Sequence, residues 1–305
     1  MSDPGPRFVW VDGALLPAAG PHLSVADRGF QLGDGLFETL RAKGGRVTEL
    51  AEHLARLRRS ADGLAIELPA DVEARLEAGI AALLAAEGLD GPTGDASIRI
   101  TVSRGSWASR GLLPPIGEVL VPTLVIQAWP VAAVPAGHLE HGLSLVACSI
   151  RRDPANPIVS LKTTSRADYV YARIEARRAG AEDALFLTTS GHLSEATTAN
   201  IFLVRDAPDG VTELATPSLE CAILPGTTRS WLLGWAESVG LRPVEGWLTP
   251  DELTAAREAF MCSSVAGILP VTRFNGHPIG DGLPGRWTRR ARADREAFIG
   301  GQRSG

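Results

Sequence analysis

Lysine is almost missing from this chain of 305 residues. Only Lys43 and Lys162 are lysines, while the other 28 basic residues are arginine. Arginine serves for surface charge and salt bridges, but its guanidinium stays protonated and cannot act as a primary-amine nucleophile. A lysine that persists in such a composition is therefore a candidate for amine chemistry. Chance survival at an exposed position is the alternative for either residue.

Cysteines are few, and the chain has neither a long apolar run nor an excess of positive charge. The three cysteines, Cys148, Cys221 and Cys262, are scattered, which excludes a disulfide framework and a cysteine zinc site and suits a reducing cytoplasm. No apolar run approaches the length of about 18 residues that a membrane span needs, and the amino terminus carries no apolar signal segment. A net charge of −5 does not suit a nucleic-acid binder. We therefore expect a cytoplasmic protein without membrane or nucleic-acid partners.

The length and the pattern of elements indicate two domains. A chain of 305 residues is about twice a typical domain. Two prolines among small residues place a linker at 129–138, between a small N-terminal domain of residues 1–128 and a larger C-terminal domain of residues 139–305. Predicted strands and helices mix without strict βαβ alternation, which favours α+β domains with largely antiparallel sheets. The sequence contains no glycine-rich nucleotide-binding motif, which argues against a nucleotide cofactor.

Hydrophobic periodicity and turn residues predict the individual elements. In the N-terminal half we expect hairpins over 7–16 and 36–50, helices over 50–64 and 72–84, and strands at 96–103 and 119–128. In the C-terminal half we expect strands at 143–150, 183–189, 200–205 and 258–262, helices over 166–179, 226–239 and 285–299, and a hairpin over 271–279. Lys43 falls at the tip of the second hairpin, which explains it as a solvated loop residue.

Lys162 has a different context. It follows an apolar strand end in PIVSLKTTSR and precedes small hydroxyl residues. A partly desolvated ammonium has a lowered pKa and a more available nucleophilic amine, as a lysine that forms a Schiff base requires. A lysine that reaches from a strand end into solvent is the alternative.

Glu195 comes just after a tight turn in SGHLSEATTANIF, before Thr197, Thr198 and Asn200 and an apolar strand. Its carboxylate could form a charged hydrogen bond to a buried cationic nitrogen. An ordinary loop acid is the alternative, because glutamate is rarely buried without a partner.

An anion site is predicted where LPGTTR (224–229) leads into a helix. The N–H groups and hydroxyls of Thr227 and Thr228 combine there with the helix dipole, although Thr227 could merely cap the helix. Ser263 and Ser264, which follow the strand at 258–262, could add hydroxyl donors or form a polar turn.

Three arginines are further candidates for anion binding. Arg56 lies on the helix over 50–64, three residues after His53, where it could hold a phosphate with two hydrogen bonds or remain a surface charge. We interpret His53 as a local hydrogen-bond partner. Arg104 and Arg110 lie in the glycine-containing loop SRGSWASRG (103–111), where either could meet a carboxylate or face solvent.

Taken together, these segments resemble the fold-type IV (class IV) pyridoxal-phosphate aminotransferases, from about residue 8 to 298. That family includes D-amino acid aminotransferases, branched-chain aminotransferases and aminodeoxychorismate lyase. The matching segments stand in family order: QLGDGLFETLR (31–41), EHLARLRRSA (52–61), SLKTTSRADYV (160–170), SEATTANIF (194–202), ILPGTTR (223–229) and FMCSSVAGILPV (260–271). The resemblance implies a two-domain fold-type IV enzyme, pyridoxal 5'-phosphate as cofactor, a homodimer and no metal.

The resemblance also implies roles around the cofactor ring. Lys162 matches the Schiff-base lysine, which becomes the general base once substrate displaces it. Glu195 matches the acid that pairs with the pyridine nitrogen. Leu224 matches the residue packed against the ring, and Thr198 belongs to the cofactor-binding positions.

At the phosphate end, Arg56 is similar to the family's phosphate-clamping arginine. Thr227 and Thr228 fall where the phosphate-binding backbone and hydroxyl lie, and Ser264 matches a further donor. These groups would hold the phosphate so that the ring stays close to the reactive lysine.

For the substrate side, the arginine-bearing loop resembles the carboxylate-binding region of D-amino acid aminotransferases and of the lyase. We expect Arg110 to bind the substrate carboxylate, with Arg104 as the next candidate and Phe37 and Ser263 as further substrate-binding residues. Phe37 stands where D-amino acid enzymes usually have tyrosine, and the histidine that follows their arginine is missing here. The two tyrosines of the chain come seven and nine residues after Lys162, later than branched-chain enzymes place theirs.

We therefore expect a cytoplasmic, dimeric transaminase that exchanges the amino group of D-amino acids with 2-oxo acids by a ping-pong mechanism. Because the carboxylate site is incomplete, (R)-amines are further expected substrates. Aminodeoxychorismate lyase is the first alternative function, and branched-chain L-amino acid aminotransferase is the second.

Overall fold

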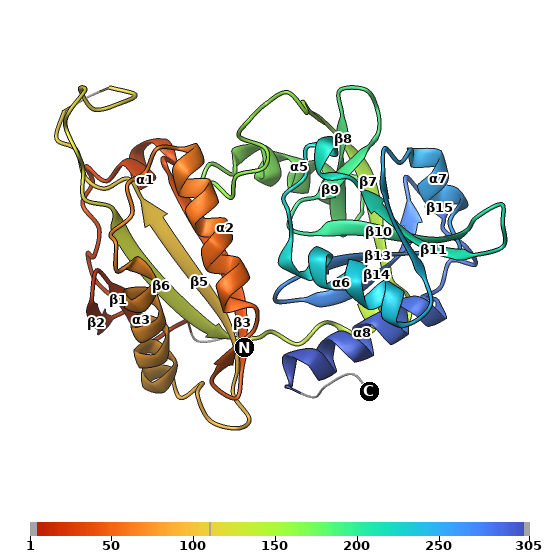
Figure 1. The fold of residues 1–305 in the computed structure, drawn as a ribbon, viewed down its shortest axis with the longest axis horizontal. Coiled ribbons are helices and arrows are strands. Elements are labelled where there is room, and N and C mark those ends of the chain that lie inside the picture. The colour runs from red at the N-terminus through yellow and green to blue at the C-terminus, as the bar shows by residue number, and fades with distance from the viewer. Residues whose placement is uncertain (1–4, 110, 302–305) are drawn as a thin grey trace. The chain divides into compact units, whose positions relative to one another are not determined.

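The computed structural model describes residues 5–109 and 111–301 and divides the chain into two compact units (Figure 1). Unit 1 runs as far as Ala132 and includes Leu161–Arg166, whereas unit 2 contains Ala133–Ser160 and the chain from Ala167 onward. The chain thus passes from unit 1 to unit 2 inside the stretch expected to be a linker. No sequence pattern indicated that residues 161–166 return to unit 1.

Unit 1 is built on one antiparallel sheet. Its strands among the described residues lie in the order β2-β1-β6-β5-β3-β4. They are β1 (Phe8–Val11), β2 (Ala14–Pro17), β3 (Gly35–Lys43), β4 (Arg46–Val47), β5 (Asp95–Ser103) and β6 (Thr123–Pro130), and the helices are α1 (Arg28–Leu32), α2 (Leu50–Gly63) and α3 (Val72–Glu87). Both hairpins and both long helices predicted for this half are confirmed. The strand expected over 119–128 begins only at Thr123, because β5 offers its last partner there, at Ser103.

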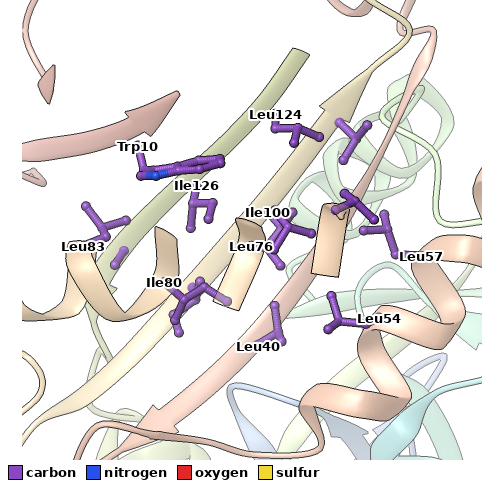
Figure 2. Close-up of a cluster of buried hydrophobic side chains, with 14 of the residues drawn as sticks. Trp10, Leu40, Leu54, Leu57, Leu76, Ile80, Leu83, Ile100, Leu124 and Ile126 are labelled. Atoms are coloured by element: carbon purple, nitrogen blue, oxygen red, sulfur yellow. The ribbon is translucent and has the colours of Figure 1, made fainter. Parts of the chain in front are cut away.

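The core of unit 1 lies between one face of this sheet and the helices α2 and α3 (Figure 2). Alternate residues of β5, among them Ile98 and Ile100, are fully buried toward the helices, and Leu54 and Leu76 meet them from α2 and α3. This is the period-2 pattern of a sheet with one covered face. The other face of β3 and β5 therefore carries side chains that the core does not use.

Unit 2 contains a nine-stranded mixed sheet within the described ranges, in the order β12-β11-β10-β13-β14-β7-β8-β9 with β15 beside β14. Its strands are β7 (Leu143–Arg152), β8 (Asp183–Thr188), β9 (Leu193–Ala196), β10 (Asn200–Asp206), β11 (Thr212–Pro217), β12 (Arg242–Gly246), β13 (Glu258–Ser263), β14 (Gly267–Phe274) and β15 (His277–Pro278). Its helices are α4 (Ala136–Glu140), α5 (Ala167–Arg178), α6 (Thr227–Ser238), α7 (Pro250–Ala255) and α8 (Arg286–Ile299), with a 3₁₀ turn at Leu219–Cys221.

The α+β class is confirmed, although the second sheet is less antiparallel than expected. β7 pairs in parallel with β8 and β14, and β11 pairs in parallel with β12. Helix α5 supplies the crossover between β7 and β8 that parallel neighbours need. The sequence analysis missed β9, β11 and β12 because they are short and border irregular segments.

Both faces of the central strands of the second sheet are buried. In β10, Ile201 and Leu203 enter one apolar cluster, while Phe202 and Val204 enter the cluster under α6 and α8. Burial on both faces explains why this strand reads as a continuous apolar run. In residues 5–109 and 111–301, no helix combines the length and apolar character needed to cross a membrane.

Candidate active site

The short segment that carries Lys162 is fixed to β3 in unit 1 by backbone hydrogen bonds. Phe37 N–H donates to the Lys162 carbonyl at 3.0 Å, and Thr164 N–H donates to the Gly35 carbonyl at 2.9 Å. The Thr164 hydroxyl adds a bond to the Gly33 carbonyl at 2.8 Å. Small hydroxyl residues after Lys162 therefore let this segment lie against the glycine motif that opens β3.

Gly35 explains why that motif requires glycine. A Cβ atom at this position would lie 2.6 Å from the Val102 carbonyl oxygen and 3.2 Å from Thr164 Oγ1. Any side chain would thus push β3 away from β5 or from the Lys162 segment. The last glycine of QLGDG is in this way a packing requirement of the contact between β3 and the Lys162 segment.

Positive charge surrounds the ring of Phe37. Lys162 Nζ lies 4.7 Å from the ring centroid, while the guanidinium carbons of Arg99 and Arg166 lie 4.0 and 5.6 Å from it. Burial lowers the pKa of Arg99, and the nearby charge of Arg166 lowers it further. Within the described part of the chain, Arg99 donates to the Thr101 hydroxyl and makes no ion pair. This apolar ring with cations around it is suited to an anionic substrate.

Arg56 forms a buried ion pair with Glu38 of β3. Its Nε and Nη2 donate to the two carboxylate oxygens at 2.8 and 2.6 Å, and His53 Nδ1 lies 2.7 Å from one of them. Glu38 and His53 are fully buried. Burial raises the pKa of Glu38, but the hydrogen bonds of Arg56 and His53, with the charges of Arg56 and Lys162, lower it to about 2. His53 is thus a local partner, as interpreted, while phosphate binding by Arg56 stays a prediction.

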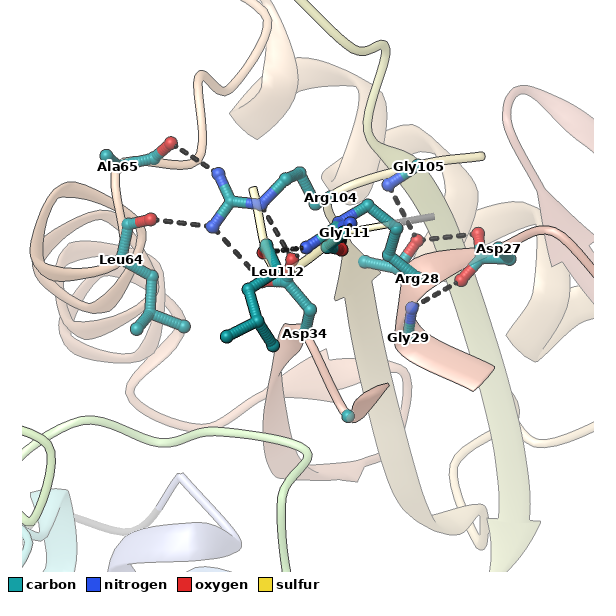
Figure 3. A network of polar contacts seen from close by, with 12 residues as sticks. Asp27, Arg28, Gly29, Asp34, Leu64, Ala65, Arg104, Gly105, Gly111 and Leu112 are labelled. Atoms are coloured by element: carbon teal, nitrogen blue, oxygen red, sulfur yellow. Dashed lines mark hydrogen bonds and ion pairs between the residues drawn. The ribbon is translucent and has the colours of Figure 1, made fainter. Parts of the chain in front are cut away.

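Arg104 belongs to a polar network at the base of the substrate loop (Figure 3). Its guanidinium donates to both carboxylate oxygens of Asp34 and to the carbonyls of Leu64 and Ala65. The carboxylate of Asp34 also accepts a bond from the buried Arg28. The substrate contact expected of Arg104 stays a prediction that competes with these bonds.

The loop itself is anchored just beyond Arg110, which lies outside the described residues. Arg28 donates to the carbonyls of Gly111 and Leu112, as Figure 3 shows. A buried guanidinium on α1 therefore fixes the chain immediately after the predicted carboxylate ligand. The sequence analysis did not single out Arg28, because nothing local distinguishes it from a surface arginine.

In unit 2, the carboxylate of Glu195 is almost completely buried and is held by several donors. Leu224 N–H donates to Oε2 at 3.0 Å, the Asn200 amide lies 3.4 Å from the same oxygen, and the Tyr169 hydroxyl lies 3.4 Å from Oε1. The alternative of an ordinary loop acid is wrong. Hydrogen bonds to a buried carboxylate favour its charged form, which a cationic ring nitrogen would need.

Tyr169 is itself packed against a buried cation. The guanidinium carbon of Arg152 lies 4.2 Å from the Tyr169 ring centroid and 4.1 Å from that of Phe186. Arg152 Nη1 forms an ion pair with Asp168 at 3.2 Å. Its Nε and Nη2 meet no hydrogen-bond acceptor among the described residues.

The start of α6 lies next to Glu195 because Asn200 connects them. The Asn200 amide also donates to the Leu224 carbonyl at 3.1 Å, and a Cβ atom on Gly226 would lie 2.1 Å from Asn200 Oδ1. Thr227 is the first helical residue, and its hydroxyl lies 3.3 Å from that of Ser264. The structure thus joins the predicted ring and phosphate segments of unit 2.

Two further residues predicted for the site, Thr198 and Ser263, are not fully buried. Thr198 is exposed, whereas its neighbour Thr197 is buried and donates to Asp183 at 2.6 Å. Ser263 ends β13 and is half-buried. The cofactor and substrate roles expected of Thr198 and Ser263 stay predictions.

The sequence analysis did not assign Glu38 and Arg99 to the group of residues around Phe37 and Arg56 in unit 1. It also did not assign Asn200 and Tyr169 to the group around Glu195 in unit 2. Glu38 did carry a signal, since it lies between Leu36 and Leu40 at the alternate positions of β3 that face the core. Arg99 carried none, because it falls at the polar positions of an alternating strand. Asn200 opens an apolar strand, where a polar amide needs a partner. Tyr169 had been judged only by its distance from Lys162.

Comparisons with known proteins point to one family. The family described as Amino-transferase class IV matches residues 35–274. D-alanine aminotransferase of Bacillus licheniformis is 29% identical and aminodeoxychorismate lyase of Vibrio harveyi is 30% identical, each over 92% of this chain and over 93% and 97% of their own lengths. Among solved structures, the branched-chain aminotransferase of Thermoproteus uzoniensis with norvaline superimposes with a TM-score of 0.84 and 28% identity, covering 98% of this chain and 97% of that one. Proteins named for three different activities therefore share similar sequence identity with this chain.

Proposed function

The chain belongs to the class IV aminotransferase family, and we propose that it is a transaminase that uses pyridoxal 5'-phosphate and exchanges amino groups between glutamate and amino acids with aliphatic side chains. The observation that carries the substrate assignment is the set of cations around Phe37. An apolar ring accommodates an aliphatic side chain, and Arg99 and Arg166 accommodate the distal carboxylate of glutamate or 2-oxoglutarate.

The residues present fit the cofactor. The first turn of α6 offers N–H groups, the positive end of the helix dipole and the hydroxyls of Thr227 and Thr228 to a phosphate. Glu195 offers a fixed carboxylate to a protonated ring nitrogen, and Lys162 offers the amine. When bound, pyridoxal 5'-phosphate supplies an electron sink that stabilises negative charge at the substrate Cα.

The chain's own groups then have distinct tasks in our proposal. Lys162 holds the cofactor and later moves the proton at the substrate Cα. Glu195 keeps a proton at the ring nitrogen, and the donors from Leu224, Asn200 and Tyr169 keep its carboxylate in place. Phe37 forms an apolar wall next to the Lys162 amine.

D-amino acid transamination is the second candidate. It is favoured by the arginine-bearing loop 103–111 that Arg28 anchors and by the likeness to D-alanine aminotransferase. In this second candidate, Arg110 binds the substrate carboxylate and (R)-amines are also accepted as substrates. We place this candidate second because D-alanine and (R)-amines have no second carboxylate for Arg99 and Arg166 to bind. D-glutamate does have one, so the experiment compares it directly with L-Glu.

A panel of half-reactions tests the choice. The enzyme is mixed in turn with L-Glu, L-Leu, D-Ala, D-Glu, (R)-1-phenylethylamine and aminodeoxychorismate, and the visible absorbance of the bound cofactor is followed. We expect L-Glu and L-Leu to bleach it fastest. Faster bleaching by D-Ala and D-Glu would establish the second candidate, pyruvate release from aminodeoxychorismate without an acceptor would establish the lyase, and no bleaching by any donor would contradict a transaminase.

The variant Arg99→Gln tests whether Arg99 binds the distal carboxylate of glutamate. It should raise the KM for L-Glu while leaving L-Leu nearly unchanged, because only glutamate has a carboxylate for Arg99 to bind. The control is Arg58→Gln, since Arg58 lies on α2 in an exposed pair with Glu73. Equal effects of Arg99→Gln on both substrates would assign Arg99 to structure alone.

We also propose that the enzyme is a homodimer. Several apolar side chains on α1 and on the loop after Arg110 are exposed, among them Phe30, Leu112 and Ile116. Arg28 holds these two segments together, and neighbouring exposed apolar residues mark an interaction surface. Light scattering at micromolar concentration should give a mass near twice 32.2 kDa, and a monomer would contradict the proposal.

A further inference from the structure

Arg295 lies on α8, far along the chain from every residue expected to bind the cofactor. Its side chain nevertheless reaches the first turn of α6, where Nη2 donates to Thr228 Oγ1 at 3.1 Å. Arg295 is fully buried and Thr228 is 2% exposed. This is a charged hydrogen bond shielded from water, and such bonds are stronger than neutral ones.

Aromatic rings and a second bond between the helices fix the position of the guanidinium. Its carbon lies 5.1 Å from the ring centroid of Trp231 and 5.2 Å from that of Phe298. One turn further along α6, the Trp235 indole donates to Asp294 at 2.8 Å. Trp231 of α6 and Phe298 of α8 together restrict the rotamer of Arg295, and the bond between Trp235 and Asp294 joins the two helices.

The bond constrains the hydroxyl proton of Thr228. A hydroxyl has one proton to donate and two lone pairs, and a guanidinium only donates. Because Arg295 occupies a lone pair, the Thr228 proton has to point elsewhere, and it remains available to an acceptor at the start of the helix. The positive charge of Arg295 also adds to the positive end of the helix dipole.

We propose that Arg295 is a positioning residue for phosphate binding: through Thr228 it turns the start of α6 into a stronger site for the phosphate group of the cofactor. This inference rests on the proposed function. Arg295 acts on the phosphate through the Thr228 hydroxyl and through its charge.

The experiment compares ligands with and without phosphate on full-length apoenzyme. Affinities for pyridoxal 5'-phosphate, pyridoxal and inorganic phosphate are measured by absorbance and calorimetry for the wild type, Arg295→Met and Arg295→Lys. Methionine keeps an apolar stem between the rings and removes the charge. The control is Arg289→Met on the same helix, because Arg289 is exposed and donates to the Pro284 carbonyl rather than to Asp294.

We expect Arg295→Met to weaken binding of pyridoxal 5'-phosphate and of inorganic phosphate on the order of 10- to 100-fold, the range for a charged hydrogen bond. Pyridoxal binding should stay unchanged, and Arg295→Lys should fall between the wild type and Arg295→Met. In the Thr228→Val background the effect of Arg295→Met should shrink, because part of it passes through the hydroxyl.

The outcomes separate this inference from the proposed function. A wild-type enzyme that binds neither pyridoxal 5'-phosphate nor phosphate contradicts the function itself. A wild-type enzyme that binds both, with an Arg295→Met variant whose preference for the phosphorylated ligand is unchanged, overturns only the role of Arg295. Circular dichroism and thermal unfolding accompany each variant, and an equal loss for pyridoxal and its phosphate would likewise assign Arg295 to structure alone.

Discussion

Both carboxylate oxygens of Glu195 accept hydrogen bonds. Leu224 and Asn200 donate to one oxygen, and the Tyr169 hydroxyl donates to the other. In a glutamine at this position, the amide oxygen can still accept from Leu224 and Asn200, while the amide nitrogen donates to the Tyr169 hydroxyl oxygen. The charge and the placement of this side chain can therefore be tested separately.

We predict that Glu195→Gln retains the cofactor but loses turnover on the order of 100-fold, because the amide keeps the shape but no longer stabilises a proton on the ring nitrogen. Cofactor stoichiometry and kcat measure the two properties. Glu220→Gln is the control, since Glu220 is exposed and accepts a hydrogen bond from the Trp247 indole. Near-normal turnover of Glu195→Gln would show that Glu195 does not serve the ring nitrogen.

The buried pair of Glu38 and Arg56 makes stability depend on pH. The pKa of Glu38 falls in the folded protein from its ordinary value of 4.5 to about 2. A lowered folded-state pKa contributes stability that is fully present above about 4.5 and is lost as the pH falls toward 2. This contribution comes mainly from the hydrogen bonds of Arg56 and His53, which outweigh the cost of burial.

We predict that Glu38→Gln lowers the free energy of unfolding at pH 7 by about 3–5 kcal/mol, because it leaves Arg56 as a buried cation without its carboxylate. Below pH 4.5 the difference from the wild type should narrow. Urea unfolding between pH 2.5 and 7 measures both effects. Glu73→Gln, which removes an exposed pair with Arg58, should leave the curve nearly unchanged, and a constant difference at all pH values would refute the linkage.

Among the helices, α6 is the element on which cofactor binding depends most in our proposal. Gly226 precedes it and packs against Asn200, while Gly234 lies in its middle, where a Cβ atom would meet only open space. The same substitution at the two glycines therefore has opposite consequences.

We predict that Gly226→Ala destabilises the protein by about 1–3 kcal/mol, the usual cost of overpacking, and weakens cofactor binding because Asn200 has to move. Gly234→Ala should stabilise the protein by up to about 1 kcal/mol through helix propensity. Thermal unfolding and cofactor titration compare them. Equal behaviour of the two variants would mean that the contact between Gly226 and Asn200 does not constrain the site.

On the scale of the whole chain, unit 1 is discontinuous. The chain leaves it at Ala132, returns for Leu161–Arg166 and leaves it again. Lys162 therefore depends on β3 and α2 for its position, although it lies in the second half of the sequence. The sequence context already separates it from Lys43, which ends β3 at the hairpin turn, and the fold adds the contact of its amine with the Phe37 ring.

We predict that borohydride reduction of the native enzyme attaches the cofactor to Lys162 and leaves Lys43 unmodified. Mass spectrometry of the digested protein locates the label, and the scarcity of lysine leaves just two positions to compare. Lys43→Arg should be labelled like the wild type, whereas Lys162→Arg should not be labelled. A label on Lys43 in the native protein would refute the assignment of Lys162.

Much of the architecture was predictable because it is local. The long helices α2, α3, α6 and α8 follow from apolar spacing, which a helix needs in order to bury one side. The capping box of Thr249 and Glu252 could also have predicted α7, but six residues are too few for a periodic pattern. The short strands β9 and β12 could not be predicted, because pairing with distant strands stabilises them.

By itself, the sequence determined the long helices, most of the strands, the α+β class and the choice of Lys162 as the candidate for amine chemistry, since periodicity, turn chemistry and the scarcity of one residue type are properties of the chain. Only the tertiary structure decided which polar groups meet. Glu38 and Arg56 are 18 residues apart, Asn200 and Leu224 are 24 apart, and Thr228 and Arg295 are 67 apart. Such pairs leave no periodic mark in a sequence, because each partner is chosen by the burial that folding creates and by the cost of an unsatisfied polar group within it.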